Sequence, residues 1–182
     1  MMKRFRFPRL WRNKKGVAAV EFALILPMFA GIYLGSVELT ELLLVNRRVE
    51  NLAASAADIV ARDTLVKESE LTDLQEAIDL LIDPNPVSGL KVRVTSIQIN
   101  SSTDCVVVWS KSYHGYATLA NGDKINDLPA ELLTGETPSI VRAQVTYDYM
   151  TPIRWLLPAT FSLKHTEYRR PRLVDPVPYS AT

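Results

Sequence analysis

The longest apolar stretch of the chain runs from Val17 to Val37, where Glu21 and Tyr33 are the only ionisable side chains. As a helix rising about 1.5 Å per residue, it would span roughly 30 Å, the thickness of the hydrocarbon layer of a bilayer. The sequence therefore predicts a transmembrane helix. A secretory signal peptide is the alternative, but its apolar region is usually about 7 to 15 residues long and ends at a small-residue cleavage site.

The helical pattern continues beyond this span, with apolar residues at alternating intervals of three and four. These residues are Leu42, Val45, Val49, Leu52, Ala56 and Ile59. Because no Gly or Pro occurs in residues 36–83, we expect one helix from about Val17 to Ala61, half in lipid and half amphipathic. The alternative is an anchor followed by a separate helix, which would have to break at residues 36–41 without a helix breaker.

A second helix is predicted over residues 72–83, "TDLQEAIDLLID". Thr72 and Gln75 have the spacing of a capping box, and Asp83-Pro84 supplies a stop signal. After the turn at residues 83–89 the apolar period changes to two, which indicates strands with one buried face.

Four segments have strand patterns. Leu90, Val92 and Val94 alternate with polar residues, whereas Cys105 to Trp109 is continuously apolar and should extend toward Tyr116. Residues 160–168, "TFSLKHTEY", are a further strand. The strongest pattern is "IVRAQVTYDY", with one apolar side and one polar side. Its apolar side is Val141, Ala143, Val145, Tyr147 and Tyr149, and its polar side is Arg142, Gln144, Thr146 and Asp148.

The remaining segments are rich in turn formers. Residues 117–138 predict a loop with a short helical turn near "PAELL", and Pro152 and Pro158 bracket another irregular piece. The tail from Pro171 contains three prolines and is expected to be loosely ordered. The pattern as a whole predicts an α+β fold, in which a long N-terminal helix packs on a small, mostly antiparallel sheet.

Charge is distributed unevenly along the 182 residues, although the formal net charge is only +1. Residues 1–16 contain seven Lys and Arg side chains and no acid, so the remainder is mildly acidic. Cations before a membrane helix stay in the cytoplasm, which predicts that residues 38–182 lie on the far side. A mildly acidic body excludes a basic nucleic-acid-binding surface.

The sequence offers little for catalysis. His114 and His165 are the only histidines, and neither has a second ligand-type residue at metal spacing, so we expect no metal site, no cofactor and no enzymatic activity. The single cysteine, Cys105, excludes an intramolecular disulfide, and its apolar neighbours favour a buried strand position over a cross-linking thiol.

Glu21 is the unusual residue, because a carboxylate within a membrane helix is costly and no Lys, Arg or His occurs from Val17 to Thr40. It either snorkels to the cytoplasmic interface without a role or pairs with a cation from elsewhere. Cleavage between Gly16 and Val17 would supply such a cation, since the new α-amine has a pKa of about 8. Cleavage would also remove the seven leader cations.

The string "KKG" followed by "VAAVEF" resembles the class III signal of type IV pilin-like proteins, which a prepilin peptidase cleaves after the glycine. "GVAAVEFALILPMF", "IVRAQVTYDYMTPI" and "RRPR" resemble the TadE-like pseudopilins of bacterial tight-adherence pilus systems, although residues 14–35 are the specific part. The resemblance implies a pilin-like fold, with Gly16 as the last leader residue, Val17 as the processed N-terminus and Glu21 as the assembly residue. Phe22 stands where small major pilins of these systems have tyrosine, and together with the large outer portion this fits a minor pilin.

Small residues supply a second assembly signal. Gly31 and Gly35 form a G-x-x-x-G pattern, and Ala19 and Ala23 repeat its spacing, so that two helices could approach closely. Pro27 lies between these pairs and would free one backbone carbonyl, which can kink a helix.

Four regions follow: a basic cytoplasmic leader (1–16), a transmembrane helix (17–37), an extracytoplasmic pilin-like domain (38–170) and a Pro-rich tail (171–182). The leading hypothesis is a minor pseudopilin of the inner membrane that helps to initiate or cap a pilus, with its outer domain in the periplasm. Its expected partners are a prepilin peptidase, other pilins and pseudopilins, and the inner-membrane assembly platform.

Two alternative functions remain open. One is an uncleaved scaffold of the same machinery. The other is a tethered adhesive or ligand-binding module that uses Trp109, Tyr113, Tyr116 and the loop 117–138.

Overall fold

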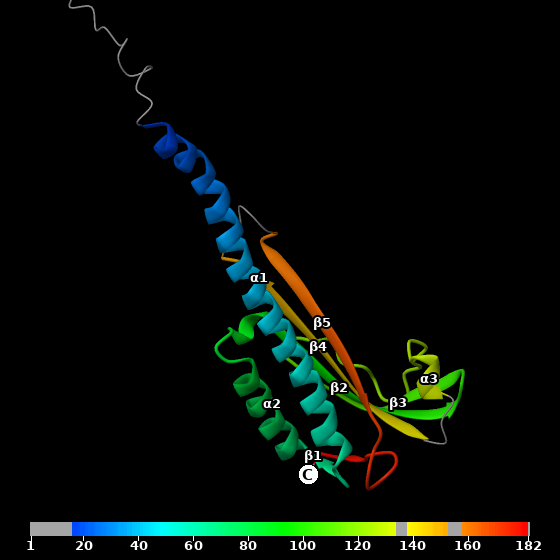
Figure 1. Ribbon diagram of the computed structural model, residues 1–182. Coiled ribbons are helices and arrows are strands. Elements are labelled where there is room, and N and C mark those ends of the chain that lie inside the picture. The colour runs from blue at the N-terminus through cyan, green and yellow to red at the C-terminus, as the bar shows by residue number, and fades with distance from the viewer. Residues whose placement is uncertain (1–15, 134–137, 153–157, 182) are drawn as a thin grey trace, which may run out of the picture.

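The computed structural model describes residues 16–133, 138–152 and 158–181, and its dominant element is the helix α1, Val17–Ala61 (Figure 1). The predicted bounds of this helix are confirmed, and the alternative of a break at residues 36–41 is wrong. The helix also continues through Pro27. The leader cations and the segment 153–157 between Pro152 and Pro158 lie outside the described residues.

Behind α1 lies a four-stranded antiparallel sheet with the order β3-β2-β4-β5. Its strands are β2 (Leu90–Ser101), β3 (Asp104–Tyr113), β4 (Ser139–Met150) and β5 (Thr160–Arg169). A separate parallel pair joins β1 (Val66–Lys67) to β6 (Tyr179–Ser180). The predicted α+β class is confirmed, as is the short turn α3 (Ala130–Leu133) in the loop before β4.

The main core lies between the sheet and two helices, the outer half of α1 and α2 (Glu68–Ile82), which run side by side in Figure 1. The apolar side of β4 faces this core as predicted, with Val141, Ala143 and Val145 at most 1% exposed. Each buried aliphatic side chain of this kind contributes about 1.5–3 kcal/mol. The α1 stripe is buried from Val45 to Ala56, but Ile59 is 45% exposed and Val60 takes the buried position near the helix end.

A smaller cluster covers the opposite face of the sheet, and it explains the continuously apolar run in β3. Cys105 and Val107 face this cluster with Ile97 and Ile125, whereas Trp109 belongs to the main core. The change of face occurs at a bulge, because Val107 pairs with Ile97 and Trp109 with Ser96, which leaves Val108 as an extra residue. Cys105 is buried, as predicted.

The second helix begins earlier than its capping pattern indicated. α2 starts at Glu68, and the Glu70 carboxylate accepts the Lys67 backbone N–H at 2.8 Å. Thr72 lies inside the helix and donates its hydroxyl to the Glu68 carbonyl at 3.1 Å. The predicted stop is correct, because the helix ends at Ile82, directly before Asp83.

The expectation of a loosely ordered tail is wrong for residues 172–180. The Arg172 N–H donates to the Ala61 carbonyl at 2.9 Å, and the buried Val177 offers its carbonyl to the Trp109 indole N–H at 2.9 Å. The Val66 N–H donates to the Pro178 carbonyl at 3.0 Å. Proline lacks a donor but keeps an acceptor, so the tail can still bond across the end of α1.

Candidate membrane and assembly site

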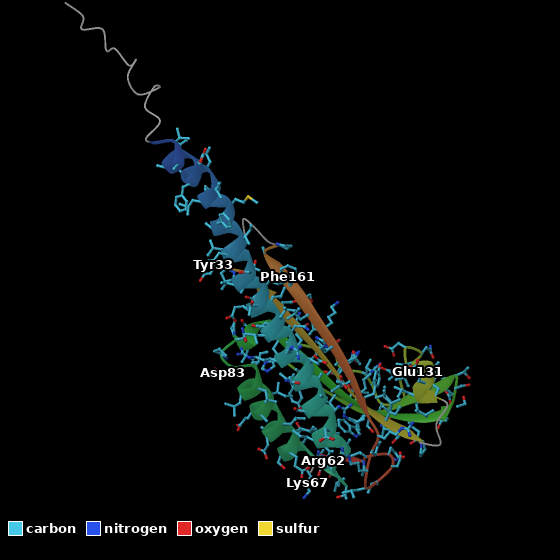
Figure 2. All side chains as sticks on the ribbon, in the orientation of Figure 1. Tyr33, Arg62, Lys67, Asp83, Glu131 and Phe161 are labelled. Carbon is cyan, nitrogen blue, oxygen red and sulfur yellow. The ribbon has the colours of Figure 1, made fainter. Side chains whose placement is uncertain are left out.

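The N-terminal half of α1 extends beyond the domain (Figure 1), and the described residues bury none of its most apolar window. In Figure 2, Tyr33 lies on the side of α1 that faces away from the sheet. Several large side chains are more than half exposed, among them Val20, Phe22, Leu24, Met28, Phe29 and Ile32. Of the helices in the described ranges, α1 is long and apolar enough to cross a membrane. An uncovered apolar surface of this size indicates contact with a membrane or another protein.

Gly16 and Val17, the predicted cleavage residues, lie at the start of this free helix. Gly16 directly precedes the first helical residue, and no side chain caps it. A Cβ atom added to Gly16 would meet nothing within 4 Å, so the fold has room for a larger side chain at this position. A requirement for glycine at this position would therefore come from something other than packing within the chain.

Glu21 and Phe22 are both exposed on the free helix. No ion pair or side-chain hydrogen bond within the described ranges reaches Glu21. Ala19 and Ala23 are exposed as well, and an added Cβ on Gly31 would meet nothing within 4 Å. Gly35 is half-buried. Among the described residues, therefore, no side-chain contact reaches Glu21, and the space around Gly31 is open.

Glu38 marks the point at which α1 first enters the domain, and sequence reasoning missed it. Its side chain is 4% exposed, and the Tyr149 hydroxyl donates to the Glu38 carboxylate at 3.0 Å. Burial, followed by this hydrogen bond, raises the pKa of Tyr149 to about 12. A signal existed, because Glu38 extends the stripe of Leu42, Val45 and Val49 by one further step of four residues.

Two more polar contacts join the following turns of α1 to the rest of the domain. His165 on β5 and Asn46 on α1 are joined by a hydrogen bond of 2.9 Å, and Arg48 donates to Asn85 at 2.7 Å. The other histidine, His114, lies 2.7 Å from Asp79 on α2. Both histidines thus connect elements of the fold. Within the described ranges, no group of three His, Cys, Asp or Glu side chains is arranged to hold a metal ion.

The aromatic residues suggested as an adhesive surface do not form one. Trp109 and Tyr113 are only 7% and 5% exposed, and the Tyr113 hydroxyl donates to the Leu71 carbonyl at 2.9 Å. Tyr116 lies under the Arg93 guanidinium, 4.7 Å from its ring centre. Trp109 and Tyr113 therefore stabilise the domain and expose little aromatic surface to solvent, whereas Tyr116 is half-buried.

Comparison with known protein families finds a match for the N-terminal part of the chain. Residues 16–58 match the family model of TadE-like proteins, and this range covers α1 almost to its end at Ala61. The match does not include the two C-terminal sequence segments that also resemble this family, which are residues 140–153 and residues 169–172. No curated protein and no solved structure matches the chain. Residues 16–58 are therefore a TadE-like domain, of a family associated with the Tad (tight-adherence) pilus.

Proposed function

We propose that the chain is a processed minor pseudopilin that helps to initiate or cap a tight-adherence pilus. The observation that carries the proposal is the apolar N-terminal half of α1, which starts at the Gly16–Val17 junction and is not buried by the described residues of the domain. The TadE-like match supports it, because the matched residues begin at the same glycine. A helix so exposed requires lipid before assembly and a neighbouring helix after it.

The charge pattern supports a defined topology. Residues 1–16, with their seven cations, stay in the cytoplasm, and residues 17–37 cross the inner membrane. The domain 38–170 and the tail 171–182 then lie in the periplasm. In this arrangement Glu38 and Tyr149 lie at the periplasmic surface of the inner membrane, where their hydrogen bond joins α1 to the domain.

Glu21 is the residue through which cleavage and assembly are coupled. After cleavage by a prepilin peptidase, the Val17 α-amine has a pKa of about 8 and is mostly cationic at neutral pH. This amine, on the same chain or on a neighbouring pilin, pairs with Glu21, which forms no ion pair with the described residues of its own domain. Gly31 and Gly35 permit the close helix contact that such a pair requires.

The experiment combines three single variants in cells that carry the pilus machinery. Gly16→Trp obstructs cleavage, so intact-mass analysis should find residues 1–16 still attached. Glu21→Gln keeps the shape but removes the charge, so the protein should be cleaved and kept in the membrane while fewer pili form. Glu50→Gln is the control, because Glu50 is exposed on α1 beyond the membrane span.

Each result separates the proposal from its alternatives. Wild-type protein that keeps residues 1–16 despite an active peptidase would identify an uncleaved scaffold. Wild-type numbers of pili with fully processed Glu21→Gln protein would leave Glu21 as a residue that only snorkels.

A further inference from the structure

We propose that the outer edge of β3, from Val108 to Ser112, binds an extended strand from another subunit of the pilus. The identity of the partner rests on the proposed function, whereas the strand-binding chemistry rests on the edge itself. β3 is an outermost strand of the sheet, because the order is β3-β2-β4-β5. Its outer backbone groups are available for pairing wherever no other segment covers them.

The first half of this edge is already paired with a segment of the chain. The Val107 N–H donates to the Asp123 carbonyl at 2.9 Å, and the Gly122 N–H donates to the Val107 carbonyl at 2.8 Å. The Ile125 N–H donates to the Cys105 carbonyl at 2.9 Å. Residues 122–125 thus add a short strand-like segment to β3, which demonstrates that the edge accepts one.

From Val108 to Ser112, no backbone group of another described segment bonds to this edge, although the Thr118 hydroxyl donates to the Ser112 hydroxyl at 3.0 Å. Alternate residues of an antiparallel strand direct their N–H and C=O groups away from the neighbouring strand, and Cys105 and Val107 are such residues. The bulge at Val108 shifts this alternation by one, so Ser110 and Ser112 take the outward positions that follow. Among the described residues, no backbone bond from another segment reaches Ser110 or Ser112.

Two hollows lie along this open edge, with volumes of about 340 Å³ and 510 Å³. They share Trp109, Ser110 and Tyr179, and between them they contact every residue from Val108 to Ser112. Leu71 of α2 lines one hollow and Leu119 of the loop lines the other. Successive side chains of a bound strand point to opposite faces, so two hollows on one edge suit a strand with an apolar side chain for each.

The other outer strand lacks these features. β5 carries Lys164, Glu167 and Arg169, and charged side chains along an edge are a common protection against strand addition. The segment Val108–Ser112 has one charge, Lys111, and that side chain is paired with Glu68 of α2. An uncharged, partly apolar strand therefore fits the edge of β3.

The test uses the purified full-length chain in detergent and overlapping synthetic peptides from the periplasmic domains of this chain and of the other pilins of the same cell. Ser110→Pro removes the outward N–H, but the inward bonds to β2 remain, so the edge position tolerates it. Ser110→Ala is the matched control, because it keeps the backbone donor. We expect at least one peptide to bind, with affinity reduced about tenfold or more by Ser110→Pro and little changed by Ser110→Ala.

Amide hydrogen exchange supplies a second measurement on the same samples. The Ser110 and Ser112 amides should exchange readily in the free protein and become protected when the peptide binds. Circular dichroism melting of Ser110→Pro verifies that the domain remains folded. Failure of every peptide to bind would overturn the proposal. So would binding that survives Ser110→Pro in folded protein, or binding restricted to peptides from this chain itself. None of these measurements involves cleavage or pilus number, so this proposal and the proposed function fail separately.

Discussion

At the scale of single residues, α1 contains two glutamates that the fold treats in opposite ways. Glu21 lies on the free helix without a partner from the described domain, whereas Glu38 is buried and accepts a hydrogen bond from Tyr149. A buried carboxylate is tolerated only when it is hydrogen-bonded, so Glu38 fixes the position at which α1 leaves the domain. Glu21 has no comparable role within the chain and is available to another molecule.

The Tyr149 hydroxyl gives a prediction about alkaline pH. Its pKa is raised from the ordinary value of 10 to about 12, first by burial and then by the bond to Glu38. A raised pKa means that the folded state holds the proton more tightly, so this stabilisation is complete below pH 10 and is lost as the pH rises through about 12.

The measurement is thermal melting of the full-length chain in detergent across this pH range. Wild-type stability should fall more steeply than that of Tyr149→Phe, which has no phenol to titrate at this position. Burial also raises the pKa of Tyr113, and that contribution is common to both proteins. Parallel curves for the two proteins would show that Tyr149 does not carry the effect.

At the scale of elements, β4 lies between two different layers. Val145 faces the helices and is 1% exposed, whereas the neighbouring Gln144 is half-buried on the other face and accepts hydrogen bonds from Arg93 at 2.7 and 3.1 Å. The polar side of the strand is thus not simply solvated. Arg142 is only 2% exposed and donates to Asp127 at 2.8 Å.

Two aspartate substitutions test this register. Val145→Asp places an unpaired charge in the helix-facing core and should destabilise the domain by more than about 3 kcal/mol. Gln144→Asp places the same charge beside the Arg93 guanidinium and should change the stability by less than about 1 kcal/mol. Thermal melting of both variants, followed by circular dichroism, compares their stabilities. Equal decreases in stability would contradict the assignment of Val145 and Gln144 to opposite faces of β4.

At the scale of the whole molecule, the C-terminal segment closes the end of the helical layer that lies far from the exposed N-terminal half of α1. Arg172 forms an ion pair with Asp58 of α1 at 2.7 Å, and the Tyr179 hydroxyl donates to Glu68 of α2 at 2.6 Å. Val177 lies in the core between these two contacts. The segment therefore joins both helices to the sheet, although little regular structure occurs in it.

A matched pair of valines tests this role. Val177 is fully buried, whereas Val174 is 38% exposed. Val177→Ala removes buried methyl groups and leaves a cavity, so it should lower the free energy of unfolding by about 1–3 kcal/mol. Val174→Ala should change it by less than about 0.5 kcal/mol. Denaturant titration of both variants measures these changes in the free energy of unfolding. Two small and equal decreases would show that the C-terminal segment contributes little to stability.

The sequence by itself determined the local features of this protein. The apolar run and the stripe after it predicted α1 to the residue, and the two-residue period predicted the buried side of β4. These predictions succeeded because helix and strand periods are properties of neighbouring residues. The residues of the candidate assembly site stay predictions, because their role depends on molecules other than this chain.

Only the tertiary structure decided the features that join distant segments. Glu38 acquires its role from Tyr149, 111 positions later in the chain, and the proline-rich tail is ordered by Trp109 and Val66. The order of strands and the bulge at Val108 likewise determine which edge of the sheet remains open. A buried polar contact or an unpaired strand edge depends on what the fold places beside it, and no local pattern in the sequence contains that information.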